Sequence, residues 1–242
     1  MSEITRFKNR TEAGELLARR LGEYAHRRDT MVLGLPRGGI PVGYAIAKIL
    51  ELPFDVLSVR KLGLPRHEEY AIGAIASGGI RFLQEDIVRA HHVPEQVIDV
   101  VVYRELKEMV RRERIYRAGR MPLQLKNMVA IIVDDGLATG ATMKVAAMAA
   151  LKANAAQVIV AVPVAAPNSF DILQPEADEI ISLITPDYFG AVGNWYEDFR
   201  QVSDDDVMHL LDEAEQDALR RESAWQEAIA NKIDASNYLR KE

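Results

Sequence analysis

Residues 128–142 have the sequence MVAIIVDDGLATGAT, and this stretch decides the fold. The apolar run 128–133 is typical of a strand that is buried on both faces of a sheet. Asp134 and Asp135 follow at once, and a loop of small residues then enters an alanine-rich segment that extends to about Ala153. The stretch therefore predicts a buried strand, an acidic turn and a helix in direct succession.

Outside this stretch, short apolar runs alternate with helical patterns along most of the chain. Strands are predicted at 31–35, 54–59, 158–164 and 179–184, helices at 9–28, 40–50 and 94–119, and a hairpin from 72–76 and 80–83 around the turn 77–79. Alternation of this kind favours a mainly parallel sheet that is flanked by helices. The predicted fold class is therefore α/β.

One domain accounts for the whole pattern, because no repeat, low-complexity segment or long linker interrupts it. We interpret 1–242 as a single domain with a core at about 7–207 and a helical C-terminal appendage at 204–242. Apolar residues form a stripe on one face of the appendage at Val207, Leu210, Leu211, Ala214 and Ala218. The stripe is expected to pack on its own domain, with an oligomer contact as the alternative.

The bulk composition excludes several classes of protein. The 242 residues carry a net charge of -6, which gives no support for binding to nucleic acid or to an anionic membrane. The lack of cysteine excludes disulfides and thiolate metal sites. The N-terminus has no apolar signal-peptide core, and no apolar run approaches the about 20 residues that span a bilayer. We therefore expect a cytoplasmic protein.

The acidic turn has the chemistry of a site for a phosphorylated sugar. In open parallel sheets, ligands bind at the carboxyl ends of strands, where Asp134 and Asp135 stand. The small residues after them let a phosphate approach backbone N–H groups at a helix N-terminus, and Thr139 and Thr142 add hydroxyl donors. Adjacent carboxylates suit Mg2+ or sugar hydroxyls. The alternative is that the acids only cap the helix and the glycines only make the turn.

Two common phosphate-binding motifs are missing from the chain. No Gly-x-x-x-x-Gly-Lys-Ser/Thr sequence is present, which argues against a P-loop nucleotidase. No Gly-x-Gly-x-x-Gly sequence follows a predicted strand, which argues against a dinucleotide-binding fold. The phosphate loop after the acidic pair must therefore be of another kind.

Residues 133–142, VDDGLATGAT, resemble the motif with which type I phosphoribosyltransferases bind 5-phosphoribosyl-1-pyrophosphate (PRPP). In that family the acids contact the ribose hydroxyls, directly or through metal-bound water, and the loop after them binds the 5-phosphate. The resemblance implies that the ribose and 5-phosphate are bound by Asp134, Asp135, Gly136, Ala138, Thr139, Gly140, Ala141 and Thr142. It also implies Mg2+ as cofactor, held mainly by PRPP, with Asp134, Asp135 and Asp198 as candidate ligands.

Two further segments carry the same resemblance. The sequence LPRGG at 35–39 resembles the family's pyrophosphate loop, which implies that Arg37, Gly38 and Gly39 bind pyrophosphate and that a non-proline peptide here can be cis. Arg60 and Lys61 begin a segment that extends to Tyr70, where the family has a mobile loop that closes over PRPP. Cations at that place stabilise the leaving pyrophosphate, so the implied catalytic residues are Lys61, Arg60, Asp134 and Asp135.

Other charged side chains near these segments have weaker claims. Arg111, Arg112 and Arg114 on the predicted long helix could complete a hood over the site, but a solvated helix face is the preferred interpretation. For Arg37 the less favoured alternative is a solvated loop residue, and without the later motif the glycines beside it would fit an ordinary strand-to-helix turn equally well.

The acceptor is the part of the reaction that the sequence defines least. Enzymes that act on 6-oxopurines commonly have an aspartate where this chain has Ala138, which counts against hypoxanthine or guanine. The segment 186–200 resembles the one that lines the base pocket of purine-salvage members, and it offers Tyr188, Phe189 and Trp195 for stacking on a planar acceptor. Aromatic residues after a buried strand are also common core residues, and that alternative stays open.

Taken over about 7–207, the chain looks most like a group of bacterial proteins described only as predicted phosphoribosyltransferases. The resemblance implies a type I phosphoribosyltransferase fold with a small hood. It implies an enzyme that moves the phosphoribosyl group of PRPP to a nitrogenous acceptor, such as a nucleobase, and releases pyrophosphate. A homodimer is expected by analogy, with no nucleic-acid or membrane partner. The alternative is a non-catalytic protein that senses PRPP or a nucleotide on the same fold.

Overall fold

The central element of the fold is a parallel five-stranded sheet. The computed structural model describes residues 6–64, 67–76, 80–117 and 119–239. The strands follow the order β2-β1-β6-β7-β8, and every neighbouring pair is parallel. Their bounds are Thr30–Gly34 for β1, Phe54–Val56 for β2, Val129–Val133 for β6, Gln157–Val164 for β7 and Glu179–Ile184 for β8. The predicted α/β class with a mainly parallel sheet is confirmed.

Helices cover both faces of this sheet, and the residues of β6 show why. Its side chains alternate: Ile131 and Val133 pack with α1 and α2, whereas Ala130 and Ile132 pack with α5. The covering helices are α1 (Arg10–Arg20), α2 (Gly39–Leu50), α5 (Ala141–Lys152) and α6 (Ser169–Leu173). The predicted helix at 9–28 ends earlier than expected, because a 3-10 turn (Gly22–Tyr24) follows α1.

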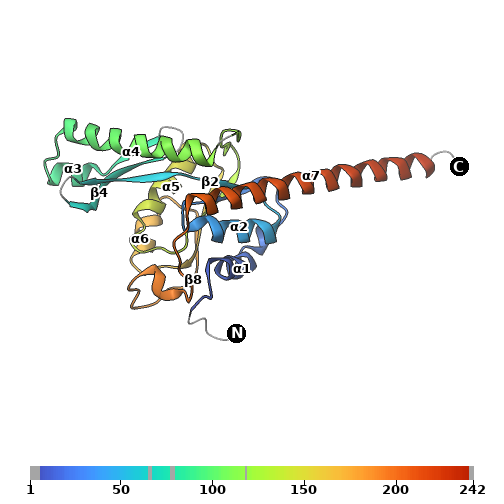
Figure 1. Cartoon of the computed structure of the whole chain (residues 1–242), viewed down its shortest axis with the longest axis horizontal. Coiled ribbons are helices and arrows are strands. Elements are labelled where there is room, and N and C mark those ends of the chain that lie inside the picture. Colours follow the sequence, from blue (N-terminus) through green and yellow to red (C-terminus); the bar gives the residue numbers. More distant parts are fainter. Residues whose placement is uncertain (1–5, 65–66, 77–79, 118, 240–242) are drawn as a thin grey trace.

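A second, smaller sheet forms a hood above the core (Figure 1). Its antiparallel strands are β3 (Val59–Leu64), β4 (His67–Ala76) and β5 (Ile80–Leu83), followed by α3 (Glu85–Ala90) and α4 (Glu95–Tyr116). Leu62, Ile72 and Met109 pack between this sheet and α4, and the same strands lie against α5. The predicted small hood is confirmed, and so is the antiparallel pair formed by 72–76 and 80–83; its turn at 77–79 lies outside the described residues.

A larger difference from the sequence prediction lies between the two sheets. The predicted strand at 54–59 divides, because β2 ends at Val56 in the core sheet and β3 begins at Val59 in the hood. The segment expected to be a loop from Arg60 onward is instead strand, and Lys61 pairs with Ala74 of β4. Leu62 and Leu64 are buried beneath α4, and this tertiary packing outweighs the polar appearance of the segment. Residues 65–66 lie outside the described residues.

The C-terminal appendage is the long helix α7 (Asp204–Leu239). Val207, Leu211 and Ala214 are buried where it crosses α2 and α4, and the helix then extends away from the rest of the chain (Figure 1). Ala218 of the predicted stripe is exposed, so the packing on the domain involves the N-terminal part of the stripe. Among the described residues, no helix is both long and apolar enough to cross a membrane.

Candidate active site

Two loops meet at the carboxyl edge of the core sheet because β1 and β6 are adjacent and parallel. The first is 35–39 after β1, and the second is 134–142 after β6; we call them together the core wall. A Cβ atom at Gly39 would lie 2.4 Å from the carbonyl oxygen of Val133, and one at Gly38 would lie 2.0 Å from a carboxylate oxygen of Asp135. Only glycine fits these positions, so the two loops are in direct contact. The Pro36–Arg37 peptide is cis, as the resemblance implies.

The loop before α5 presents backbone donors to solvent. Gly140 adopts a left-handed conformation with φ of 73° and begins α5 without a side-chain cap. In the part of the chain that the structure describes, the backbone N–H groups of Ala138, Thr139 and Gly140 donate to no other group. Uncapped N–H groups at a helix N-terminus attract anions. The loop can therefore receive a phosphate group without any rearrangement of its own hydrogen bonds.

The acidic pair lies directly beside this loop. Asp134 accepts a hydrogen bond through Oδ1 from the backbone N–H of Asp135 at 2.9 Å. Burial, together with repulsion from Asp135, raises the pKa of Asp134 well above its ordinary value. Burial also raises the pKa of Asp135, against the attraction of Arg10. Two close carboxylates in a poorly solvated place suit a ligand that brings hydroxyl donors or a cation.

Arg10 holds one half of the acidic pair in place. Its Nε and Nη2 atoms lie 2.9 Å and 2.8 Å from Oδ2 of Asp135, and both side chains are largely buried. Its Nη1 donates to the carbonyl oxygen of Arg200 at 2.9 Å, and its guanidinium group lies 3.9 Å from the ring centre of Phe199. Tyr196 donates its hydroxyl hydrogen to the carbonyl oxygen of Asp135 at 2.6 Å. The acidic turn is thus held in place by Arg10 from α1 and by Tyr196 from the segment before α7.

Cationic side chains of the hood face the core wall across a cleft of about 330 Å3. The hood contributes Arg60, Lys61, Arg104, Glu105 and Arg112, which we call the hood wall; Pro36 and Thr142 line the opposite side. Arg60 donates through Nε and Nη2 to Oε2 of the buried Glu105 at 3.0 Å and 2.7 Å. Lys61 is exposed and also lines a larger cleft of about 860 Å3 beside Thr139 and Ala141. The structure thus brings both predicted catalytic cations to the core wall.

The sequence of the chain identifies its family. Residues 2–192 match the family model of the phosphoribosyl transferase domain. The chain belongs to that family. The predicted resemblance is therefore confirmed, although the family assignment does not name an acceptor.

Relatives of this phosphoribosyl transferase domain are found in two bacteria. The chain is 44% identical over 211 residues to "Putative phosphoribosyl transferase Rv0571c" of Mycobacterium tuberculosis (strain H37Rv), with 87% of this chain and 47% of that protein covered. It therefore spans about half the length of the curated relatives that it matches. The crystal structure of TT1426 from Thermus thermophilus superimposes with a TM-score of 0.76 at 37% identity, covering 85% of this chain and 97% of that one.

The three aromatic residues predicted for the acceptor do not gather around one cleft of this phosphoribosyl transferase domain. Tyr188 is 93% exposed. Phe189 and Trp195 pack instead in a cluster with Phe7 and Tyr196, and Trp195 donates through Nε1 to the carbonyl oxygen of Phe189 at 3.0 Å. Their part in acceptor binding stays a prediction, and Tyr188 is the member of the set whose ring is open to a ligand.

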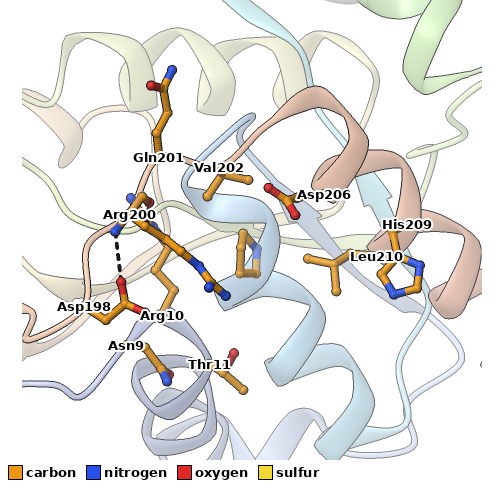
Figure 2. A pocket seen from close by; sticks show the side chains of 11 residues that line it. Asn9, Arg10, Thr11, Asp198, Arg200, Gln201, Val202, Asp206, His209 and Leu210 are labelled. Carbon is orange, nitrogen blue, oxygen red and sulfur yellow. Dashed lines mark hydrogen bonds between the residues drawn. The ribbon is translucent and has the colours of Figure 1, made fainter.

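Asp198, a candidate magnesium ligand, lines a small pocket of about 230 Å3 together with Arg10 and Arg200 (Figure 2). Its side chain accepts a hydrogen bond from the backbone N–H of Arg200 at 3.1 Å. Within the described residues, no three His, Cys, Asp or Glu side chains form a group that could hold a metal ion. A metal at this site would therefore need oxygen atoms from the substrate as well.

Arg10 and Tyr196 are the site residues that the sequence did not reveal. Arg10 stands after the helix-capping Asn9 in a run of mixed charge, where an exposed residue is the ordinary expectation. Its partner is 125 positions away, so no local pattern joins the two. Tyr196 belongs to the aromatic segment 186–200, but only its neighbours in that segment were predicted to contact a ligand.

Proposed function

We propose that the chain is a PRPP-dependent phosphoribosyltransferase that moves the phosphoribosyl group to a nitrogen atom of an acceptor and releases pyrophosphate. The observation that carries this proposal is the cleft between the core wall and the hood wall. It brings several cations of the hood wall together with Pro36 and Thr142 of the core wall. The acidic pair and the amides of 138–140 belong to the same core-wall loop as Thr142. PRPP has the matching parts: a 5-phosphate, a ribose with two free hydroxyls and a pyrophosphate at the anomeric carbon.

Each part of PRPP has a partner of suitable chemistry. The amides and hydroxyls of 138–142 suit the 5-phosphate. Asp134 suits the ribose hydroxyls, and so does Oδ1 of Asp135, since Arg10 engages the other oxygen, Oδ2. The loop 35–39 and Lys61 suit the pyrophosphate, whose negative charge grows as the bond to the anomeric carbon breaks. The acceptor nitrogen forms the new bond, pyrophosphate leaves with the bonding electrons, and the nitrogen loses its proton to solvent.

The residues present fit Mg2+ as a cofactor that arrives with PRPP. Magnesium prefers oxygen ligands, retains several waters and is commonly bound by one or two carboxylates together with substrate phosphates. Asp134 and Asp135 supply such carboxylates, directly or through water. The bound ion would neutralise charge on the pyrophosphate. Asp198 is a less suitable ligand, because it lines a different pocket from the cleft between the two walls.

The acceptor that we propose is a nucleobase or a related heterocycle. The 860 Å3 cleft beside Thr139 is large enough for a ring of that size and is lined partly by the apolar side chains of Phe82, Ile87 and Ile172. The exposed ring of Tyr188 offers a second stacking surface. Ala138 in place of an aspartate disfavours 6-oxopurines among the candidates.

Pyrophosphate release from PRPP and Mg2+ across a panel of nucleobases, related heterocycles and small amines tests the proposal. Turnover that depends on one acceptor, on PRPP and on Mg2+ is the expected result. Calorimetry with PRPP alone accompanies the panel. Tight PRPP binding without release on any acceptor would favour the alternative, a non-catalytic sensor of PRPP. Failure to bind PRPP in the presence of Mg2+ would reject both.

A further inference from the structure

The long helix α4 presents its arginines to two different places. Arg112 lines the cleft between the two walls, together with Pro36 and Thr142. Arg111 and Arg114 line a separate outer groove with Val110 and Ile115. In the sequence these three arginines are alike, as members of one charged run. The fold separates them, because neighbouring residues of a helix point about 100° apart.

The guanidinium group of Arg112 is only partly engaged. Its side chain is 20% exposed, and its Nε atom donates to Oε1 of Glu108 at 2.9 Å. Within the residues that the structure describes, its two terminal nitrogens donate to no protein atom. A half-buried guanidinium with open donors on the wall of a cleft is a suitable anion contact, since its fork matches phosphate oxygens.

The pyrophosphate loop reaches the same cleft. Its Pro36 lines the cleft together with Arg112 of α4 and Thr142 of the loop before α5. Arg112 is therefore at a place where an anion held by the loop 35–39 can be met from the hood.

The hood wall has more positive than negative side chains at the cleft. Among the described residues that line the cleft, it has the cations Arg60, Lys61, Arg104 and Arg112 and the carboxylate Glu105, so positive charge predominates in this set. Glu105 is bonded by Arg60 and by Arg104, so its charge is directed at those two side chains. Arg112 has its own carboxylate in Glu108, which Arg111 shares. The cleft as a whole therefore favours a multiply charged anion.

We propose that Arg112 binds the pyrophosphate group of PRPP from the hood side, opposite the loop 35–39. The inference rests on the proposed function and adds a contact from α4 to it. Arg112 would bond non-bridging oxygens through its two open nitrogens, while the loop 35–39 offers backbone atoms from the core. The hood and the core would then close on one anion, and binding would require α4 to keep its place over the cleft.

Titration calorimetry with inorganic pyrophosphate and Mg2+ tests the contact without any acceptor. Arg112→Gln is expected to weaken pyrophosphate binding by about tenfold or more, the loss that a charge-assisted hydrogen bond carries. Arg112→Lys retains the charge, and its pyrophosphate affinity is expected to lie between that of the unaltered chain and that of Arg112→Gln. Arg111→Gln is the matched control, because it also removes a partner of Glu108 but faces the outer groove. It is expected to bind pyrophosphate as the unaltered chain does.

Binding of ribose 5-phosphate shows whether Arg112 contacts pyrophosphate directly or only supports the structure of α4. This ligand lacks pyrophosphate, so Arg112→Gln is expected to leave its affinity unchanged. An equal loss for pyrophosphate and for ribose 5-phosphate would overturn the inference and assign Arg112 to the support of α4. Unchanged pyrophosphate affinity in Arg112→Gln would also overturn it, with the proposed function intact. If the unaltered chain bound neither PRPP nor pyrophosphate, the proposed function itself would fail.

Discussion

The core wall and the hood wall of the site offer charge in different ways. The core wall offers mainly backbone: glycines in direct contact with the neighbouring loop and open amides at the start of α5. The partly buried carboxylates of Asp134 and Asp135 stand beside them. The hood wall is built from the ends of long side chains that share acids on α4. Backbone donors are fixed by the fold, whereas long side chains can follow a changing charge. The core wall is therefore suited to hold the sugar phosphate, and the hood wall to meet the leaving group.

The largest effect is expected where the acidic pair of the core wall is neutralised. Asp134→Asn with Asp135→Asn should abolish PRPP binding, a loss on the order of a hundredfold or more, because the ribose hydroxyls lose two charged acceptors. Calorimetry with PRPP and Mg2+ measures the loss. Circular dichroism checks that the fold is retained.

The single variant Asp134→Asn is the control for the double one. It leaves the ion pair of Arg10 with Asp135 intact, so any loss of affinity in it comes from ribose recognition and not from a released arginine. Retained PRPP affinity in the folded double variant would show that the acidic pair is not part of the site. It would also contradict the assignment of the sugar phosphate to the core wall and of the leaving group to the hood wall.

The second effect should appear in rate more than in affinity. Lys61→Ala on the hood wall is expected to lower the rate of pyrophosphate release by roughly a hundredfold, the size seen when one preorganised group that stabilises developing charge is removed. The KM for PRPP should change only modestly, since the core wall still holds the sugar phosphate.

Lys107→Ala is the matched control for Lys61, because this exposed lysine of α4 lines the outer groove and neither of the two clefts that Lys61 lines. It should leave the rate unchanged. A Lys61→Ala variant with the rate of the unaltered chain would show that the hood wall does not act on the leaving group.

The two walls also differ in how far the sequence predicts them. The core wall is predicted in detail because strand, acids and loop are contiguous, and a contiguous pattern of residues such as Asp134 and Gly140 carries its own geometry. The strand that carries Lys61 is predicted as a loop, since the burial of Leu62 beneath α4 depends on a helix that begins more than thirty residues later. The packing of α4 on the hood sheet also decides that Arg112 lines the cleft, so the sequence alone does not predict its position.

The third effect is expected when Arg10 is replaced. Arg10 near the N-terminus bonds Asp135 of the core wall and the carbonyl oxygen of Arg200. Arg10→Gln should weaken PRPP binding by about tenfold, because Asp135 loses the charge-assisted bonds that hold it in place. It should also lower the melting temperature, since a largely buried carboxylate is left without its cation. Arg10→Lys should restore part of both losses.

Arg6→Gln is the comparison for Arg10. Arg6 also bonds the C-terminal segment, through the carbonyl oxygen of Tyr196 at 2.7 Å, but it makes no contact with Asp135 among the described residues. Its loss should leave PRPP binding unchanged. Equal PRPP affinity in Arg10→Gln and the unaltered chain would mean that Arg10 only secures the segment around Arg200.

The smallest effect concerns the acceptor. Trp195 and Phe189 are poor probes, because their rings are part of a packed cluster and their removal would leave a cavity. Tyr188→Ala is cleaner, since its ring is 93% exposed and its loss should not change the melting temperature. If the acceptor stacks on this ring, its KM should rise by about threefold to tenfold, while the KM for PRPP stays the same.

Tyr103→Ala on the outer face of α4 gives the background for that change, because Tyr103 is an exposed tyrosine outside every cleft that involves the core wall. An acceptor KM that is the same in Tyr188→Ala and Tyr103→Ala would remove the aromatic segment from acceptor binding. The 860 Å3 cleft between β5, α3 and α6 would then be the remaining candidate, and Phe82→Ala would be the variant that raises the acceptor KM. The acceptor would in that case lie between the two walls, with Lys61 beside it.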